Sequence, residues 1–223
     1  MDESSLHSIR LSLQVALIST VLVTIIGCTT AYFLATRKFR GKTVCEILIA
    51  LPLIMPPTIT GYYLVMIFGK NTLLGKILYD WTGCVIMFSW FAAVIASFVV
   101  SFPLMVKVSQ AAIESIDKSL IDSAYILGYS EWETAVKIVL PLAKKGILSG
   151  VILSFARAIG EFGATLMLAG NIPGKTSTMP LAIYTFAASG EWYKAHGMVA
   201  ILTVLSGVFL YLALSLSEKE GKS

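Results

Sequence analysis

The chain has 223 residues, of which 57% are hydrophobic and only 13% carry a charge. This composition is too apolar for a soluble domain and indicates a protein that crosses a membrane several times. The formal net charge of +4 is small. Because it follows from basic residues gathered beside hydrophobic runs, it gives no reason to expect nucleic-acid binding.

Hydrophobic runs divide the chain into candidate membrane spans. The first ten residues, MDESSLHSIR, lack the basic segment and cleavage site of a signal peptide, so the run after them is expected to remain as a span. Runs of about 20 or more uncharged residues are long enough to cross roughly 30 Å of hydrocarbon. Four such runs cover residues 11–35, 47–68, 84–106 and 196–216, and a fifth, 146–169, is equally long but contains two charges. We therefore predict an all-α polytopic fold of five transmembrane helices in one transmembrane domain, 1–223, with its core over 11–216.

Basic residues predict how these spans are oriented. Eleven of them fall on one side of the predicted spans and five on the other, and the positive-inside rule assigns the richer side to the cytoplasm. The N-terminus is then outside, whereas the C-terminus and the loop over 107–145 are cytoplasmic. The eleven are Arg37, Lys38, Arg40, Lys42, Lys107, Lys118, Lys137, Lys144, Lys145, Lys219 and Lys222; the five are Arg10, Lys70, Lys76, Lys175 and Lys194.

Three prolines stand in the second run, LPLIMPPTITGYYL. Pro52, Pro56 and Pro57 each remove a backbone donor that lipid cannot replace, so a kink or break here must be covered by other helices or face water. One interpretation is a packing kink, and the other is a helix that bends when a pore opens. The pattern does not decide between them.

Ser97 and Ser101 lie four residues apart in the third run, among Ala and Val. Small residues at this interval permit close helix packing, which is the role we expect by default. Their hydroxyl groups are also candidates for contact with a passing oxyanion.

Cys28, Cys45 and Cys84 are isolated and lie in apolar surroundings, without a second cysteine or a histidine at ligand spacing. We expect them to be packing residues, and we expect no metal site.

Residues 117–141 form the one long segment with a soluble character. Asp117 is placed to cap a short helix in which Leu120, Ala124 and Leu127 recur at helical spacing. Gly128 then breaks the helix, because glycine reaches the left-handed conformation without steric cost. Two short helices joined by a glycine turn would make a knob that a partner could hold.

The second short helix of this segment is predicted to begin at Ser130. Ser130 and Glu133 have the spacing of a capping box. The helix is expected to stop near Pro141, where the next hydrophobic run begins. One apolar stripe along it consists of Trp132, Ala135, Val136 and Val139.

The spacing of this segment resembles the EAA loop of ATP-binding cassette importer permeases. The family pattern is Glu-Ala-Ala, then Gly, then Ile-x-Leu-Pro, and here two of the first three residues differ. The resemblance implies a coupling helix that docks into a groove on a cytoplasmic ATPase; the alternative is an ordinary loop with a solvated charged face. The corresponding positions are Asp122 and Ser123, which differ from the pattern, and Ala124, Gly128, Ile138, Leu140 and Pro141, which match it.

Arg157 and Glu161 are the two charges within the hydrophobic run over residues 146–169. They are four residues apart, so they share a helical face and can pair. A neutral structural pair is one interpretation, because ions in the bilayer normally face protein or water. In the other, Arg157 lends positive potential to an anion pathway while Glu161 limits its affinity.

The residues after this run do not predict a nucleotide site. The stretch AGNIPGKT, 169–176, lacks the first glycine of a P-loop and has no strand before it. The run 181–189 is too short to cross a membrane, so we expect an external or half-inserted helix there.

Several stretches together resemble the molybdate permease subunits and, less closely, the sulfate/thiosulfate permeases. They are 51–64, 78–106 and 157–184, and the likeness extends over about 11–216. It implies a multi-pass protein of the cell inner membrane that is a transport subunit and not an enzyme. The implied partners are a second permease subunit, two cytoplasmic ATPases that bind ATP and Mg, and an external molybdate- or tungstate-binding protein; no cofactor is expected on this chain.

On this reading, the candidate translocation path comprises Pro56, Pro57, Ser97, Ser101, Arg157 and Glu161. The main alternatives are a sulfate/thiosulfate permease and, from a different class, a passive anion channel. A membrane-embedded enzyme is not indicated, because Arg157 with Glu161 supplies no nucleophile.

Overall fold

The computed structural model describes the backbone of residues 2–83 and 85–219, and the side chains of these residues except 73, 78, 82 and 212–219. Cys84 and Lys222, which figure in the sequence analysis, lie outside these ranges. Over the described residues the chain is helical without strands. The elements are α1 Glu3–Thr36, α2 Lys42–Ile54, α3 Pro57–Phe68, α4 Leu73–Thr82, α5 Trp90–Glu114, α6 Lys118–Ile126, α7 Glu131–Thr134, the π-helix η1 Ala135–Val139, α8 Leu140–Ile159, α9 Gly163–Ala169, α10 Met179–Ala188 and α11 Trp192–Lys219.

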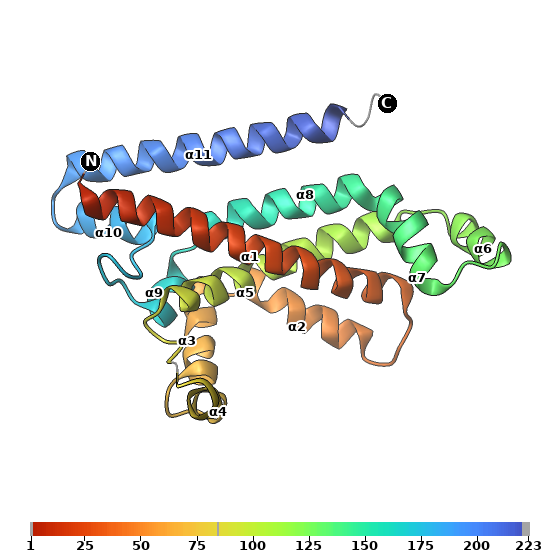
Figure 1. Ribbon diagram of the computed structural model, residues 1–223, viewed down its shortest axis with the longest axis horizontal. Helices are drawn as coiled ribbons and strands as arrows, with labels where there is room; N and C mark the ends of the chain where they lie inside the picture. Colours follow the sequence, from red (N-terminus) through yellow and green to blue (C-terminus); the bar gives the residue numbers. More distant parts are fainter. Residues whose placement is uncertain (1, 84, 220–223) are drawn as a thin grey trace.

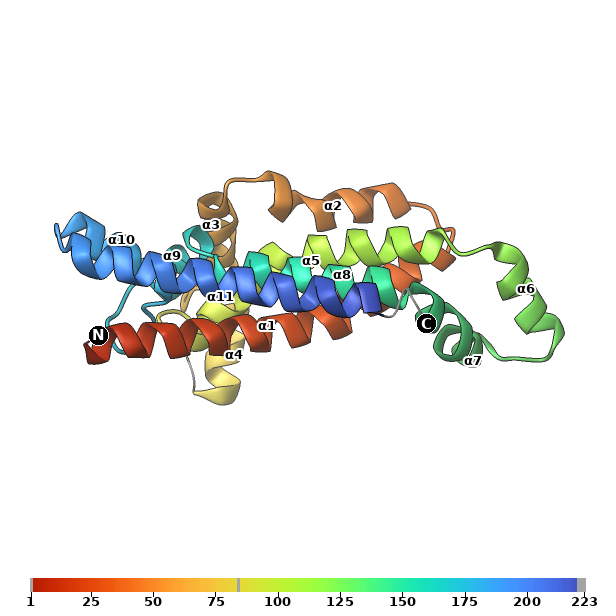
Figure 2. The same cartoon turned by 90° about the horizontal axis from the view of Figure 1, so that it is seen from above.

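The long helices lie roughly parallel along the longest axis of the molecule (Figure 1). Helix α5 is central and packs against α1, α8 and α2, whereas α11 packs against α8 and α10. The two views place α6 and α7 at one end, α10 and the N-terminus at the other, and α3 with α4 projecting from the side (Figures 1 and 2). The elongated shape therefore has two distinct ends joined by spanning helices.

The prediction of five spans is confirmed when one bent helix pair is counted as a single span. Four helices of the described chain are long and apolar enough to cross a membrane, and the pair α2–α3 is the fifth candidate. The third span differs from its prediction, since α5 begins at Trp90 and continues to Glu114. It therefore projects past the apolar run toward residues 117–141.

The second predicted span is broken. Helices α2 and α3 meet at a bend of 116°. The break follows from the paired prolines: Pro56 and Pro57 have no N–H to donate, and Met55 adopts an extended conformation with ψ of 145°. The predicted kink or break is therefore present as a sharp bend, and a helix that bends further when a pore opens stays a prediction.

Pro141 does not end a helix, contrary to the prediction. Residues Glu131–Ile159 form one continuous helix of 29 residues, whose first part belongs to the segment 117–141. The turn before Pro141 is a π-helix in which the N–H of Leu140 bonds to the carbonyl of Ala135. This wider turn changes the hydrogen-bond register where proline can neither donate nor tolerate the usual carbonyl, so the helix passes through it.

The interior is built mainly from small and branched side chains of α1, α5 and α8. Ala16, Ala93, Ala96 and Ala164 have no exposed surface. Helix α2, in contrast, buries none of its residues, so Cys45 is exposed and not packed as predicted, whereas Cys28 is partly buried. The predicted short helix after the fourth span is present as α10.

Candidate functional site

Residues 117–141, here called the interhelical loop, contain two short helices joined by a tight turn at one end of the molecule (Figure 2). The carboxylate of Asp117 accepts a hydrogen bond of 2.9 Å from the N–H of Ser119, so it caps α6 as predicted. Hydrogen bonds from the Ser119 backbone and side chain hold the pKa of Asp117 below its usual range. The first helix of the loop thus starts at a local, sequence-encoded cap.

Gly128 adopts the left-handed conformation that its sequence position predicts, with φ of +85°. The N–H of Gly128 bonds to the carbonyl of Tyr125 at 3.0 Å, and that of Tyr129 bonds to Ala124 at 3.1 Å. These two bonds make a Schellman motif, which ends α6 and reverses the chain. An added Cβ at Gly128 would meet nothing within 4 Å, so the conformation and not crowding requires glycine.

The second helix of the loop starts with the predicted capping box. The N–H of Ser130 donates to Glu133 at 3.0 Å, and the N–H of Glu133 donates to the Ser130 hydroxyl at 3.3 Å. Lys137 Nζ lies 3.0 Å from Glu133 Oε1. The Ser130 backbone hydrogen bond, with Lys137 and the Ser130 hydroxyl, lowers the pKa of Glu133 from 4.5 to about 2.

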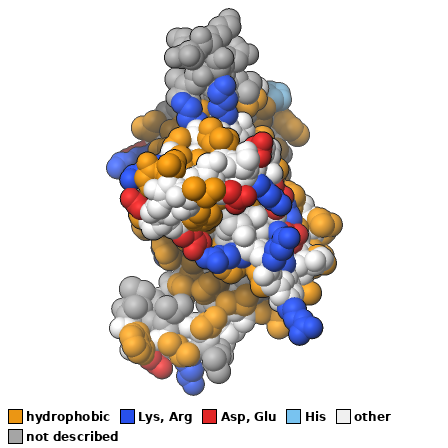
Figure 3. All heavy atoms as spheres, turned by 90° about the vertical axis from the view of Figure 1, so that its right-hand side faces the viewer, with side chains coloured by type: hydrophobic (Ala, Val, Ile, Leu, Met, Phe, Trp, Pro, Cys, Tyr) orange, Lys and Arg blue, Asp and Glu red, His pale blue; other side chains and the backbone are white. Residues whose placement is uncertain are grey.

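The apolar residues of the interhelical loop are less buried than their periodicity predicts. Ala124, Ala135 and Val139 are buried, but Leu120, Leu127, Trp132 and Val136 are exposed. Ile126 at the end of α6 is 85% exposed and Trp132 is 77% exposed. Seen from this end, apolar patches lie among Lys and Arg side chains (Figure 3). The loop therefore presents an apolar surface with a charged border, the composition of a protein-docking site.

The remaining positions that correspond to the EAA loop lie along the same segment. Asp122 is exposed and lines a hollow of about 410 Å³ between α6 and the ends of α1 and α5. The hydroxyl of Ser123 donates to the carbonyl of Ser119, so it is engaged within α6. Ile138 and Leu140 are partly buried and Pro141 is exposed. These residues are thus spread over α6, η1 and the start of α8 and do not line one convergent pocket.

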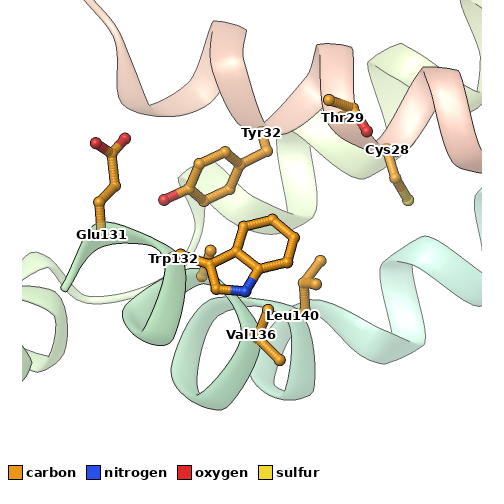
Figure 4. A pocket seen from close by; sticks show the side chains of 8 residues that line it. Cys28, Thr29, Tyr32, Glu131, Trp132, Val136 and Leu140 are labelled. Atoms are coloured by element: carbon orange, nitrogen blue, oxygen red, sulfur yellow. The ribbon is translucent and has the colours of Figure 1, made fainter. Parts of the chain in front are cut away.

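A long-range ion pair fastens the interhelical loop to the first span. Arg37, at the end of α1, donates to both carboxylate oxygens of Glu131 at the start of α7. Beside it, a cavity of about 400 Å³ separates α1 from α7 and η1. Tyr32 and Trp132 reach into this cavity from opposite sides (Figure 4). Because Arg37 and Glu131 are 94 residues apart, no spacing in the sequence could have indicated this contact.

A second candidate region is where the bend between α2 and α3 meets the break between α8 and α9, residues 55–61 and 157–164, here called the break junction. An added Cβ at Gly163 would lie 3.0 Å from Pro57 Cβ and 3.1 Å from the nitrogen of Thr58. One at Gly61 would lie 2.9 Å from Ala164 Cα. The backbones of α3 and α9 therefore touch. Gly163 therefore permits this close approach, whereas an added Cβ at Gly160 would make only an ordinary contact of 3.7 Å.

Glu161 is buried in the break junction and paired as predicted. Arg157 Nη1 lies 2.8 Å from Glu161 Oε2, with side-chain exposures of 27% and 1%. The other oxygen, Oε1, accepts a 2.7 Å hydrogen bond from the N–H of Ala164. Glu161 lies beyond the end of α8 at Ile159 and caps the start of α9. Oε1 is thus hydrogen-bonded, whereas the buried Oε2 has the charge of Arg157 beside it but no hydrogen bond, and Arg157 is only partly reachable by an anion.

Ser97 and Ser101 are both buried on α5. The Ser101 hydroxyl donates to the carbonyl of Ser97 at 2.6 Å, and Ser154 on α8 reaches the Ser101 carbonyl at 3.5 Å. These contacts agree with the default expectation of packing. Pro56 is exposed and Pro57 partly buried, both at the break between α2 and α3.

Comparisons with known proteins point to transport. Residues 23–218 match the family described as binding-protein-dependent transport system inner membrane component. The transport system permease protein YvgM of Bacillus subtilis is 43% identical over 202 residues, covering 90% of this chain and 88% of that protein. The molybdenum transport system permease protein ModB of Haemophilus influenzae is 39% identical over 218 residues, covering 97% and 95%. The sulfate transport system permease protein CysW of Synechococcus elongatus is 32% identical over 221 residues, covering 99% and 77%.

Solved structures share the fold at low sequence identity. A bacterial ABC transporter involved in the import of the acidic polysaccharide alginate aligns with a TM-score of 0.80 at 18% identity, covering 98% of this chain and 80% of that one. The MetNI methionine ABC transporter in an inward-facing conformation aligns with a TM-score of 0.77 at 15% identity, covering 98% and 99%. The arrangement of helices is therefore one that ABC importers use.

Proposed function

Because the chain belongs to the family of binding-protein-dependent transport system inner membrane components, we propose that it is the membrane-spanning subunit of an ATP-driven importer of molybdate. Tungstate is a second cargo, since both are tetrahedral dianions of nearly equal size. The observation that carries the proposal is the match over almost the whole length of permeases named for molybdenum transport. ATP and Mg bind to a separate ATPase and not to this chain.

The interhelical loop is the proposed contact with the ATPase. Its fixed turn at Gly128 and its capped helices make it a rigid knob, and Ile126, Leu127 and Trp132 supply exposed apolar surface. A passive anion channel would need spans but no such knob. The EAA-type residues from Asp122 to Pro141 fall on this element. We place the loop and the C-terminus in the cytoplasm and the N-terminus outside, on the basis of the basic residues gathered at the loop end.

The break junction is the proposed moving part of the pathway. A dianion cannot cross hydrocarbon unaided, so the protein must offer a route that is never open at both ends. Two copies of this chain, rocking about a symmetry axis, would provide it. Pro56 and Pro57 lie at the bend of a span, and Arg157 lies in the last turn of α8 before the chain breaks and continues as α9; such interruptions are where backbone is free to line a cavity. An external binding protein would deliver the anion, and its arrival would favour closure of the ATPases.

A sulfate/thiosulfate permease is the second candidate, supported by the 32% identity to a sulfate permease. It ranks lower because the identity to the molybdenum permeases is higher.

Reconstitution tests both candidates. The chain, its ATPase and its binding protein are placed in proteoliposomes, and ATP hydrolysis and uptake are measured with molybdate, tungstate and sulfate in turn. We expect molybdate and tungstate to stimulate hydrolysis and to accumulate. Stimulation by sulfate alone would favour the second candidate, and uptake without ATP would favour a channel.

A further inference from the structure

Helix α2 is attached to the rest of the molecule in an unusual way. None of its residues is buried, and its main neighbour is α5. It follows Gly41, which has φ of +92°, and it ends at the 116° bend to α3. A helix that buries so little of its surface gains from another means of being held in place.

A polar cluster between α2 and α5 supplies that means. The Nε2 group of Gln110 donates to Glu46 Oε1 at 2.8 Å and to Glu114 Oε1 at 2.9 Å. Lys42 Nζ lies 3.6 Å from Glu114 and 3.8 Å from Glu46, and Lys107 Nζ lies 3.9 Å from Glu46. One amide thus links two carboxylates on two helices, and two lysines balance their charge.

Burial distinguishes Gln110 from the other members of this cluster. As a residue Gln110 is only 6% exposed, whereas the side chains of both lysines and both glutamates are 24–46% exposed. Ion pairs as exposed as these contribute little by themselves, because water screens them. Hydrogen bonds from a buried amide to charged acceptors are stronger and directional. Gln110 is therefore the residue on which the geometry of the cluster depends.

The position of the cluster joins the two candidate functional regions. Glu114 is the last residue of α5, and Asp117, which caps α6, follows three residues later. At the other end of α2, Pro57 begins α3 and touches Gly163 in the break junction. A displacement of the interhelical loop that moves the end of α5 would thus be passed to α2 through this cluster and then to the bend.

We propose that Gln110 is a positioning residue that couples the interhelical loop to the break junction by holding α2 to α5 through Glu46 and Glu114. The inference rests on the proposed function, because the displacement it transmits is the one that an ATPase would impose on the loop. The proposal does not require the two lysines or the two glutamates of this cluster to contact the transported anion.

The test compares two identical substitutions in the reconstituted complex. Gln110→Leu keeps the approximate size of the side chain but removes both donors. Gln14→Leu makes the same change at an exposed position of α1, so it is the matched control. We expect Gln110→Leu to lower the anion transported per ATP hydrolysed on the order of tenfold, with basal ATP hydrolysis and assembly with the ATPase unchanged. Gln14→Leu should leave all three quantities as they are.

A second variant separates positioning from a merely structural role. Gln110→Lys restores a donor facing both glutamates, so it should recover most of the lost transport per ATP. A purely structural residue would instead lower assembly, hydrolysis and transport together, which would overturn the inference. Equal ratios for Gln110→Leu and Gln14→Leu would also overturn it. If the unaltered chain shows no ATP-driven uptake, the proposed function itself fails, so the two failures are distinguishable.

Discussion

The interhelical loop is held by interactions between residues close in the sequence, whereas the break junction is held by contacts between distant segments. In the loop, each turn is set by residues a few positions apart, such as Ser130 with Glu133 and the left-handed Gly128. In the break junction, the decisive contacts join α3 to α9, more than one hundred residues apart, as in the approach of Gly163 to Pro57. The comparison teaches that the proposed docking element is locally rigid, whereas the proposed moving element depends on tertiary contact.

The largest effect is expected at Arg157. Replacing it by Ala removes the ion-pair partner of Glu161, which is 1% exposed, and leaves a buried carboxylate without compensation. We expect molybdate uptake to be abolished in cells in which the variant is still inserted in the membrane. Radiolabelled uptake, normalised to the amount of protein, is the measurement.

A double variant tells which role the arginine has. Glu161→Gln keeps an oxygen that accepts from the Ala164 N–H but removes the charge. The unpaired buried negative charge that Arg157→Ala creates is then absent. If Arg157 supplies potential to an anion path, the double variant stays inactive. Recovered uptake would contradict the path and leave the pair a structural role.

The close packing of α3 against α9 in the break junction is tested at Gly61. An added Cβ would lie 2.7 Å from Met167 Cβ and 2.9 Å from Ala164 Cα, so Gly61→Ala should destabilise the fold by about 1–3 kcal/mol through overpacking. The midpoint of thermal unfolding in detergent measures this. Gly207→Ala on α11 is the control, because nothing lies within 4 Å of its added Cβ, and it should be neutral or slightly stabilising.

Local rigidity of the interhelical loop is tested at Gly128. A β-branched residue resists a φ of +85°, so Gly128→Val should strain the turn by about 1–2 kcal/mol and uncouple ATP hydrolysis from transport while the spans still assemble. The reconstituted complex is assayed for substrate-stimulated hydrolysis. Gly174→Val is matched, with φ of +71° and open space around it, but lies at the opposite end of the molecule. Normal stimulated hydrolysis in Gly128→Val would refute the rigid-turn argument.

The smallest effect is expected at the capping box. The pKa of Glu133 is lowered from 4.5 to about 2 in the folded loop. Its contribution to local stability is therefore complete above pH 4.5 and is lost as the pH falls toward 2. Hydrogen exchange of the α7 amides should accelerate over that range, beyond the intrinsic pH effect. In Glu133→Gln, which keeps an acceptor for the Ser130 N–H but does not titrate, the extra acceleration should be absent; its persistence would show that a group other than Glu133 is responsible.

The same difference between local and long-range contacts decides which features could be predicted from the sequence. The number of spans, the cap at Asp117 and the turn at Gly128 were predictable, because each depends on neighbouring residues or on a long apolar run. Pro141 misled the prediction, since a π-turn admits a proline that an α-turn would reject. The three prolines predicted that the helix is disturbed near Pro56, but they did not predict the angle of the bend.

Contacts between distant segments lay beyond any pattern in the sequence. The pairing of Arg37 with Glu131 and the link from Gln110 to Glu46 join residues 94 and 64 positions apart. The pairing of Arg157 with Glu161 was predictable because four residues separate them. The position of Glu161 beyond the end of α8 was not, because it depends on α9 beginning again at Gly163.

The central claim is that the interhelical loop lies in the cytoplasm, where an ATPase can hold it. In a variant with Cys28, Cys45 and Cys84 replaced by serine, Ile126→Cys places one thiol on the 85% exposed tip of α6. Gly174→Cys, in the loop before α10, is the opposite-side control. We predict that a membrane-impermeant maleimide labels residue 126 only in inside-out vesicles and residue 174 only in right-side-out vesicles. Labelling of residue 126 from the outside would contradict the account.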